Sequence, residues 1–219
     1  MKIIVMVLAS KGDPYDTFLS NWKSLRVPEG MKVIYYFLDP TIQKPELHGN
    51  ELYIPGTESI TPGTYLKTIA AFKYALANEE FDYLVRPNMS SAINLVALQQ
   101  WLVGKSTANH GFGPWLFNSF LSGCGFALTH DVVERFVQWH HPMRPIYVDD
   151  LMLKQFMDEN IVPHTPWELL GCNYDIPNFR DPNIFHHRFM TNRNDRSQDK
   201  VHHKLAIEYF NSLSSSLQS

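Results

Sequence analysis

Two runs of residues near the start of the chain show no alternation between apolar and polar positions. After an initial lysine, residues 2–8 and 32–38 contain only aliphatic, methionine or aromatic side chains. A strand that is covered on both faces has this pattern, whereas a half-exposed strand alternates. Shorter runs at residues 52–54, 82–86 and 125–128 predict further strands.

Apolar residues at helical spacing lie between these runs. The clearest stripe follows Thr64 and consists of Tyr65, Ile69, Phe72 and Leu76. Lys67 lies outside this stripe, which frees its side chain to reach into a cleft. Further helices are predicted at about residues 90–103, 129–139, 147–159 and 199–213. Because strands alternate with helices, we expect an α/β fold with a mostly parallel central sheet and helices on both faces.

The last predicted helix also has a stripe, formed by Val201, Leu205, Tyr209 and Leu213. The adjacent pair His202-His203 lies on the same helix, where neighbouring residues point in different directions. We therefore expect both histidines at the solvated surface.

The composition is that of a folded domain with a substantial core. The chain has 219 residues, of which 44% are hydrophobic and 19% charged. Its formal net charge of −3 argues against a nucleic-acid partner, which normally requires a basic face. Its two cysteines, Cys124 and Cys172, form neither a disulfide framework nor a metal-type pair. No apolar run approaches the roughly 20 residues that span a bilayer. We expect a cytoplasmic protein without a transmembrane segment.

Ligands of parallel α/β sheets bind beyond the carboxyl ends of the strands. Three predicted strands end at polar residues, namely at Ser10, at Asp39 and at Arg86, which is followed by Pro87 and residues 88–90. We expect these three positions to meet in one site.

The segment Phe81-Asp-Tyr-Leu-Val-Arg-Pro-Asn-Met-Ser-Ser91 resembles the strand and turn that carry the Asp-X-Asp motif of nucleotide-sugar glycosyltransferases with the A-type, Rossmann-like fold. Three later segments follow in the order and spacing of those enzymes. They are the Ser-Gly-X-Gly segment at 122–125, the acidic pair at 149–150 and the histidine-containing loop at 184–188. The resemblance covers roughly residues 1–195, and the chain is similar to small viral or microbial members.

This resemblance implies a hexosyl- or pentosyltransferase that uses a nucleotide sugar, with a UDP-sugar favoured, and a glycan acceptor. It implies one domain over residues 1–213. The donor-binding part covers about 1–105, the acceptor and catalytic part about 106–197, and the C-terminal helix about 199–213. Residues 214–219 form a frayed tail.

The resemblance also implies roles for single residues on the donor side. Ser10 and Asp39 would bind the nucleoside, although Asp39 can equally begin an Asp-Pro turn. Lys67 and Arg86 would bind the diphosphate. The late loop would fold over it with His187 and Arg188.

On the acceptor side, Asp150 would be the general base of an inverting transfer, and Asp149 would orient the helix start. Retention by front-face attack is the alternative stereochemistry, and paired acids that only complement a helix dipole are the alternative role. Gly123 and Trp115 would lie beside the acceptor.

The chain departs from this pattern at the metal site. Asn88 and Ser90 occupy the two acidic positions, and an amide with a hydroxyl binds a hard divalent cation poorly. We therefore expect that Mn²⁺ or Mg²⁺ is not required or is weakly held by Asn88, Ser90 and His187, with protein cations in its place. An Asx turn followed by a helix cap would explain Asn88 and Ser90 without a ligand.

Two alternative functions remain from the sequence. The missing Asp-X-Asp motif suits a glycosyltransferase-shaped protein that binds a nucleotide sugar without catalysis. The ten histidines suggest a histidine-dependent metallohydrolase, although none forms a recognised ligand spacing.

Overall fold

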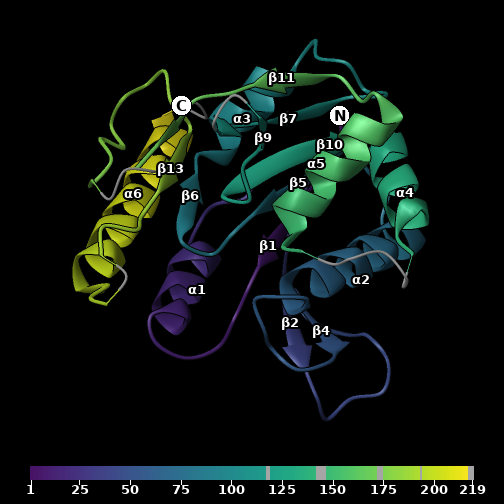
Figure 1. Cartoon of the computed structure of the whole chain (residues 1–219). Helices are drawn as coiled ribbons and strands as arrows, with labels where there is room; N and C mark the ends of the chain where they lie inside the picture. Colours follow the sequence, from purple (N-terminus) through teal and green to yellow (C-terminus); the bar gives the residue numbers. More distant parts are fainter. Residues whose placement is uncertain (117–118, 142–146, 172–174, 193, 217–219) are drawn as a thin grey trace. The chain divides into compact units, whose positions relative to one another are not determined.

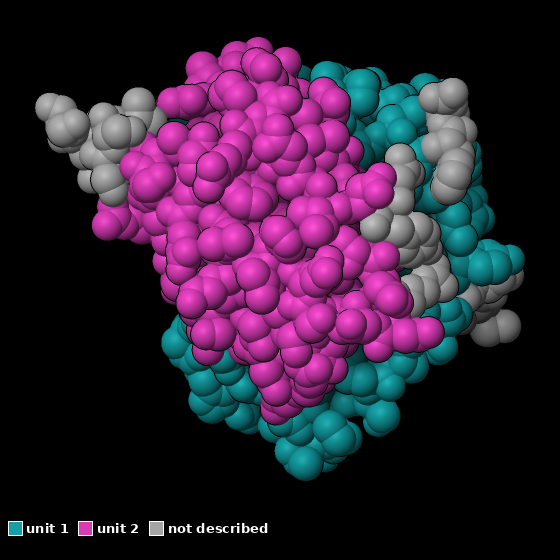
Figure 2. All heavy atoms as spheres, turned by 90° about the vertical axis from the view of Figure 1, so that its left-hand side faces the viewer, with its two compact units in different colours: residues 1–10, 30–87, 106–167 teal, residues 11–29, 88–105, 168–219 magenta. Residues whose placement is uncertain are grey.

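The computed structural model describes residues 1–116, 119–141, 147–171, 175–192 and 194–216. They form two compact units, each built from three separate stretches of chain (Figure 2). Unit 1 comprises Met1–Ser10, Gly30–Pro87 and Ser106–Trp167, and unit 2 comprises Lys11–Glu29, Asn88–Lys105 and Glu168–Ser219. The expectation of one domain over residues 1–213 stays a prediction.

Eight strands in the described part of unit 1 form one sheet with the order β11-β7-β10-β5-β1-β2-β4-β3 (Figure 1). Their bounds are β1 Ile3–Leu8, β2 Met31–Asp39, β3 Glu46–His48, β4 Glu51–Pro55, β5 Tyr83–Pro87, β7 Gly111–Gly113, β10 Gly125–Thr129 and β11 His164–Pro166. A separate antiparallel pair is formed by β8 (Trp115–Leu116) and β9 (Phe120–Leu121).

The sheet is mixed, so the prediction of a mostly parallel sheet is wrong. Strands β5, β1, β2 and β4 run parallel, as expected. Strand β10 is antiparallel to both β5 and β7, and β3 is antiparallel to β4. The β3–β4 pair is a hairpin whose turn uses Gly49 at a φ of 63°, a backbone conformation that glycine adopts without steric cost. A hairpin of this kind needs only a short local turn, unlike a parallel crossover.

Helices α2 (Gly63–Asn78), α4 (His130–Trp139) and α5 (Asp149–Asn160) share one hydrophobic core with a single face of the sheet. Strand residues in this core include Ile4, Met6, Ile34 and Tyr36. Tyr65, Ile69 and Phe72 are buried there, which confirms the apolar stripe of α2. The intervening strand residues Ile3, Val5 and Val7 are also buried. Both faces of β1 are therefore covered, as its sequence predicts.

Unit 2 contains helices α1 (Tyr15–Lys23), α3 (Leu95–Leu102) and α6 (Ser197–Ser216). Its strands β6 (Ser91–Ile93), β12 (Leu169–Leu170) and β13 (His186–Arg188) form a sheet in the order β12-β13-β6. The helix expected from residue 90 begins at Leu95 instead, because residues 91–93 pair with β13. The cap is Asn94, whose side chain accepts a hydrogen bond from the amide of Ala97 at 3.2 Å.

The buried face of α6 differs from the predicted one. Val201 and Leu205 are 58% and 43% exposed, whereas Ala206, Ile207 and Phe210 are buried. The helix also continues to Ser216, past the expected end at residue 213, and residues 217–219 lie outside the described part.

His203 is completely buried on α6, so its expected place at the surface is wrong. Its Nε2 lies 3.1 Å from the carbonyl oxygen of Ser91, and its Nδ1 lies 3.3 Å from the side-chain amide of Asn21. These two partners satisfy one neutral imidazole tautomer, which explains how a polar ring is stable in the interior.

Cys124 is a buried cysteine, and Cys172 lies outside the described residues. In the described part of the chain, no helix combines the length and apolar character that crossing a bilayer requires.

Candidate active site

Unit 1 brings the polar ends of several strands to one edge of its sheet. Strands β5, β1 and β2 are parallel neighbours, so their carboxyl ends lie together. Strand β10 runs in the opposite direction and starts with Gly125 opposite Pro87. The loop at residues 122–124 therefore reaches the same edge. This arrangement places Ser10, Asp39 and Arg86 on one edge, as the sequence predicts.

Arg86 is the centre of a buried polar network at this edge. Its guanidinium forms an ion pair with Asp149, donates to the carbonyl oxygen of Gly123, and donates from Nε to the hydroxyl of Tyr36 at 3.2 Å. The central guanidinium carbon, Cζ, also lies 5.7 Å from the centre of the Phe126 ring. Burial acts to lower the pKa of Arg86, but the charge of Asp149, together with Tyr36 and Asp150, outweighs this effect, so the pKa is raised. Arg86 is thus a permanent buried cation.

Two hydroxyl groups complete this network. Thr68 donates to Oδ2 of Asp149 at 3.1 Å, and the hydroxyls of Tyr36 and Thr68 are 3.1 Å apart. Since the Thr68 proton goes to Asp149, Tyr36 donates to Thr68 and accepts from Arg86. Burial raises the pKa of the Asp149 carboxyl, and the Arg86 charge opposes that rise. A buried ion pair is tolerated only when its remaining polar atoms are paired in this way.

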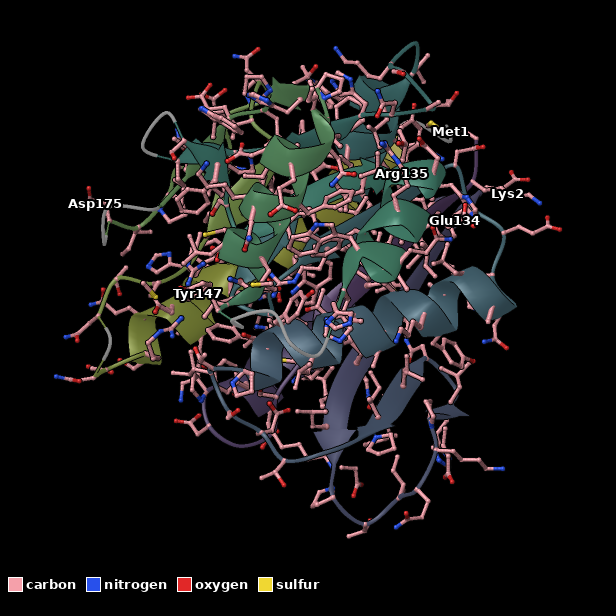
Figure 3. All side chains as sticks on the ribbon, turned by 45° about the vertical axis from the view of Figure 1, so that its right-hand side comes forward. Met1, Lys2, Glu134, Arg135, Tyr147 and Asp175 are labelled. Atoms are coloured by element: carbon pink, nitrogen blue, oxygen red, sulfur yellow. The ribbon has the colours of Figure 1, made fainter. Side chains whose placement is uncertain are left out.

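Asp150 follows in the same acidic pair but lies in a different environment. The residue is half-buried, and its Oδ2 accepts a hydrogen bond from the amide of Gly123 at 3.1 Å. Its Oδ1 accepts from the amide of Leu151 at 2.9 Å, within the first turn of α5. Tyr147, two residues before the start of this helix, is exposed (Figure 3). The start of α5 is confirmed, and of its two acids Asp150 is the one that solvent reaches.

Lys67 does not project into a cleft, in contrast to the prediction from its place on the helix. Its ammonium is buried and donates to the carbonyl oxygen of Ala9 and to Oε1 of Glu58, each at 2.6 Å. Burial lowers the pKa of Lys67, and the Glu58 carboxylate acts against that effect. A buried ammonium is stable only with a compensating partner, and for Lys67 that partner is the Glu58 carboxylate.

The other residues predicted in unit 1 have simpler surroundings. Ser10 is half-buried after β1. The Oδ1 atom of Asp39 accepts from both the amide and the hydroxyl of Thr41, at 2.9 and 2.6 Å, which is the turn considered for it. Trp115 is half-buried and stacks on His164, with ring centres 3.6 Å apart and planes 7° apart.

Asn88 and Ser90 belong to unit 2 and form a local turn. The side-chain oxygen of Asn88 accepts from the hydroxyls of Ser90 and Ser91, each at 3.1 Å. This is the Asx-type arrangement that the sequence left open. The sequence also suggested a helix cap directly after this turn, but the cap of α3 is Asn94.

His187 and Arg188 lie on β13, also in unit 2. The buried His187 donates from Nε2 to the carbonyl oxygen of Ile184 at 3.0 Å, and burial lowers its pKa to about 4. At neutral pH it is therefore uncharged and does not serve as a cation. Arg188 is half-buried and contacts the sulfur of Met190 at 3.3 Å.

These residues do not fit a divalent metal. Asn88 and Ser90 provide no carboxylate, and the Asn88 oxygen is already hydrogen-bonded to two hydroxyls. Across the residues with described positions, no group of three or more histidine, cysteine, aspartate or glutamate side chains could hold a metal ion.

The sequence did not indicate three residues that define this edge, namely Tyr36, Thr68 and Glu58. Tyr36 lies in an apolar run and Thr68 on the core side of a helix, so both are indistinguishable from core residues before their partners are known. Glu58 lies in a loop whose sequence matches no motif. The tendency of buried charges to be paired is the one signal that could have suggested them.

No protein-family profile and no curated protein sequence matches the chain. Among solved structures, the chain is similar to a glycosyltransferase involved in the glycosylation of the major capsid of PBCV-1, with a TM-score of 0.52 and 8% identity over 94% of this chain and 100% of that one. It is also similar to an active-site mutant of LgtC, with a TM-score of 0.50 and 12% identity over 98% of this chain and 95% of that one. At such identities the likeness establishes the fold alone: the chain has a mixed α/β glycosyltransferase fold.

Proposed function

We propose that the protein transfers a sugar from a nucleotide-sugar donor to a hydroxyl group of a glycan acceptor, with Asp150 as the general base. One solved structure with this fold is a glycosyltransferase involved in the glycosylation of the major capsid of PBCV-1. The fold supports the reaction class, and the edge of the unit 1 sheet supports the assignment of residues.

The observation that carries the proposal is the difference in environment between the two carboxylates of the acidic pair, Asp149 and Asp150. Asp149 is buried and neutralises Arg86, whereas Asp150 is half-buried and, among the residues with described positions, accepts hydrogen bonds from the backbone amides of Gly123 and Leu151. A general base must reach the proton that it removes and must not be bound by a cation. Asp150 meets both conditions, and it lies beside the carboxyl ends of the strands, where ligands of α/β sheets bind.

In the proposed reaction, Asp150 accepts the proton of the acceptor hydroxyl while that oxygen bonds to the anomeric carbon of the donor sugar. The bond from this carbon to the diphosphate oxygen breaks, and the nucleoside diphosphate leaves with the bonding electron pair. Attack opposite the leaving group inverts the configuration. We propose that the reaction does not depend on a tightly held metal, because Asn88 and Ser90 do not fit a divalent ion.

A second candidate is a binding protein that holds a nucleotide sugar without transferring it. The hydrogen-bonded turn of Asn88, Ser90 and Ser91 favours it, since Asn88 and Ser90 occupy the two acidic positions of the Asp-X-Asp motif in the glycosyltransferases that the sequence resembles. No arrangement among the described histidines favours the metallohydrolase.

The test compares Asp150→Asn with Asp149→Asn in assays of nucleoside diphosphate release from a panel of UDP-, GDP- and dTDP-sugars with glycan acceptors. Asp150→Asn should lower the transfer rate by about 10²–10⁴-fold, because it removes the base, and should leave donor affinity unchanged. Asp149→Asn should lower the free energy of unfolding by about 3 kcal/mol, because it leaves Arg86 buried without its counter-ion.

Donor binding without any release by the wild-type protein would favour the binding protein. Full transfer by Asp150→Asn would remove Asp150 as the base and contradict the inverting mechanism proposed here.

A further inference from the structure

Glu58 lies at the carboxyl ends of β1 and β2, in the loop between β4 and α2. Its Oε1 accepts hydrogen bonds from the amide of Leu38 at 3.3 Å and from the ammonium of Lys67 at 2.6 Å. The side chain is nevertheless 43% exposed. From the described residues, every hydrogen bond to this carboxylate goes to Oε1. One oxygen thus anchors the carboxylate, and the other is available to a ligand.

Lys67 fixes the orientation of this carboxylate. Its side chain is only 1% exposed, and its two hydrogen bonds go to Ala9 and Glu58. A phosphate group could reach this ammonium only by displacing Glu58. Because a buried unpaired ammonium is strongly unfavourable, Lys67 holds Glu58 in place and does not serve as a free phosphate ligand.

The backbone before Glu58 supports the same geometry. Gly56 has a φ of 146°, a conformation that favours glycine, and its amide donates to the carbonyl oxygen of Asp39 at 3.2 Å. A Cβ at Gly56 would lie 3.0 Å from the Leu38 side chain. The turn therefore attaches this loop to the end of β2 and brings Glu58 to the Leu38 amide.

We propose that Glu58 binds the ribose hydroxyls of the nucleotide donor and that Lys67 is its positioning residue. This inference rests on the proposed function. A carboxylate accepts hydrogen bonds from O–H groups and repels phosphate, so its partner is the neutral sugar of the nucleotide. In doubly wound sheets, an acidic side chain near the end of the second strand binds ribose in this way. Asp39 was expected in this role, but its Oδ1 accepts from Thr41.

The experiment measures binding of the diphosphates of uridine, guanosine, adenosine and cytidine, and of their 2′,3′-dideoxy counterparts, by calorimetry. The wild-type protein should prefer the best ribonucleotide over its dideoxy form by about 10–100-fold, the range for a charge-assisted hydrogen bond. Glu58→Gln keeps the size of the side chain and should remove most of this preference.

Glu79→Gln is the matched control. Glu79 also pairs with a lysine, Lys32, at 2.6 Å, but it follows the opposite end of α2. This variant should retain the full ribose preference. Lys67→Gln should reduce the preference while Glu58 is still present, and Lys73→Gln, on the exposed side of the same helix, should not. A purely structural lysine would lower stability without changing the ratio of the two affinities.

The inference is overturned if Glu58→Gln keeps the full ribose preference, if the wild-type protein binds both forms equally, or if Asp39→Asn alone removes the preference. In each case nucleotide binding would still stand, and with it the proposed function. If the wild-type protein binds none of the four ribonucleotides, the inference fails, and the proposed function fails with it unless the protein releases nucleoside diphosphate from a dTDP-sugar.

Discussion

At the level of single residues, the position of the Asp150 carboxylate depends on the missing side chain of Gly123. A Cβ at Gly123 would lie 2.8 Å from Oδ2 of Asp150, closer than carbon and oxygen normally approach. Gly123→Ala should therefore displace the carboxylate. A misplacement of about 1 Å can cost on the order of 100-fold in rate. We expect kcat of transfer to fall by about 10–100-fold, with donor affinity unchanged, in steady-state and binding measurements.

The double variant Gly123→Ala/Asp150→Asn is the control. If Gly123 acts through Asp150, the double variant should be no slower than Asp150→Asn alone, because coupled residues are not additive. If the rate loss of the double variant equals the product of the two single losses, Gly123 affects the reaction independently of Asp150.

At the level of elements, His203 connects α6 to α1 and β6 within unit 2. It is hydrogen-bonded to Asn21 and Ser91, and its ring lies 5.0 Å from that of Phe18. His203→Leu removes the hydrogen bond that the ring makes with each of these two buried partners, which costs about 1–3 kcal/mol for each group. We expect the free energy of unfolding in urea to fall by about 2–4 kcal/mol. The neighbouring His202 is half-buried, and His202→Leu should change the free energy of unfolding by less than about 0.5 kcal/mol. Equal effects of the two substitutions would contradict this role of His203.

For the whole molecule, two buried histidines predict a loss of stability in acid. Burial lowers the pKa of both His187 and His203 to about 4, from an ordinary value of 6.5. Between these values the unfolded chain binds protons that the folded chain does not. The contribution of these two histidines to the free energy of unfolding is therefore fully present above about pH 6.5, and it decreases as the pH falls to 4. Each histidine contributes at most about 3 kcal/mol.

Urea unfolding at a series of pH values measures this dependence. The wild-type free energy of unfolding should decrease from pH 7 to pH 4, and His203→Leu should reduce the slope. A slope that is the same in both proteins would show that His203 does not contribute to it.

The whole reaction should also tolerate removal of metal ions. Because Asn88 and Ser90 do not fit a divalent cation, transfer should continue in EDTA, measured as release of nucleoside diphosphate. Loss of all turnover in EDTA, restored by stoichiometric Mn²⁺, would show that other residues form a metal site.

Several features follow from the sequence because neighbouring residues determine them. The unbroken apolar runs at residues 2–8 and 32–38 require cover on both faces, and β1 and β2 have it. Acids at positions 149–150 favour a helix start through the helix dipole and through bonds to their own backbone amides, and α5 begins there. The carboxyl edge of the parallel strands, and with it the place of the candidate site, could be predicted in the same way.

Other features depend on partners that are distant along the chain, and only the tertiary structure decides them. The direction of β10, the change of residues 91–93 from helix to strand, and the buried face of α6 each follow from the element that packs alongside. The charges of the site behave in the same way. The sequence presents Lys67 and Arg86 as free cations, but burial makes an unpaired charge very unfavourable, so Glu58 and Asp149 neutralise them. This pairing leaves Asp150 as the accessible acid of its pair, a distinction that two adjacent aspartates cannot reveal in the sequence.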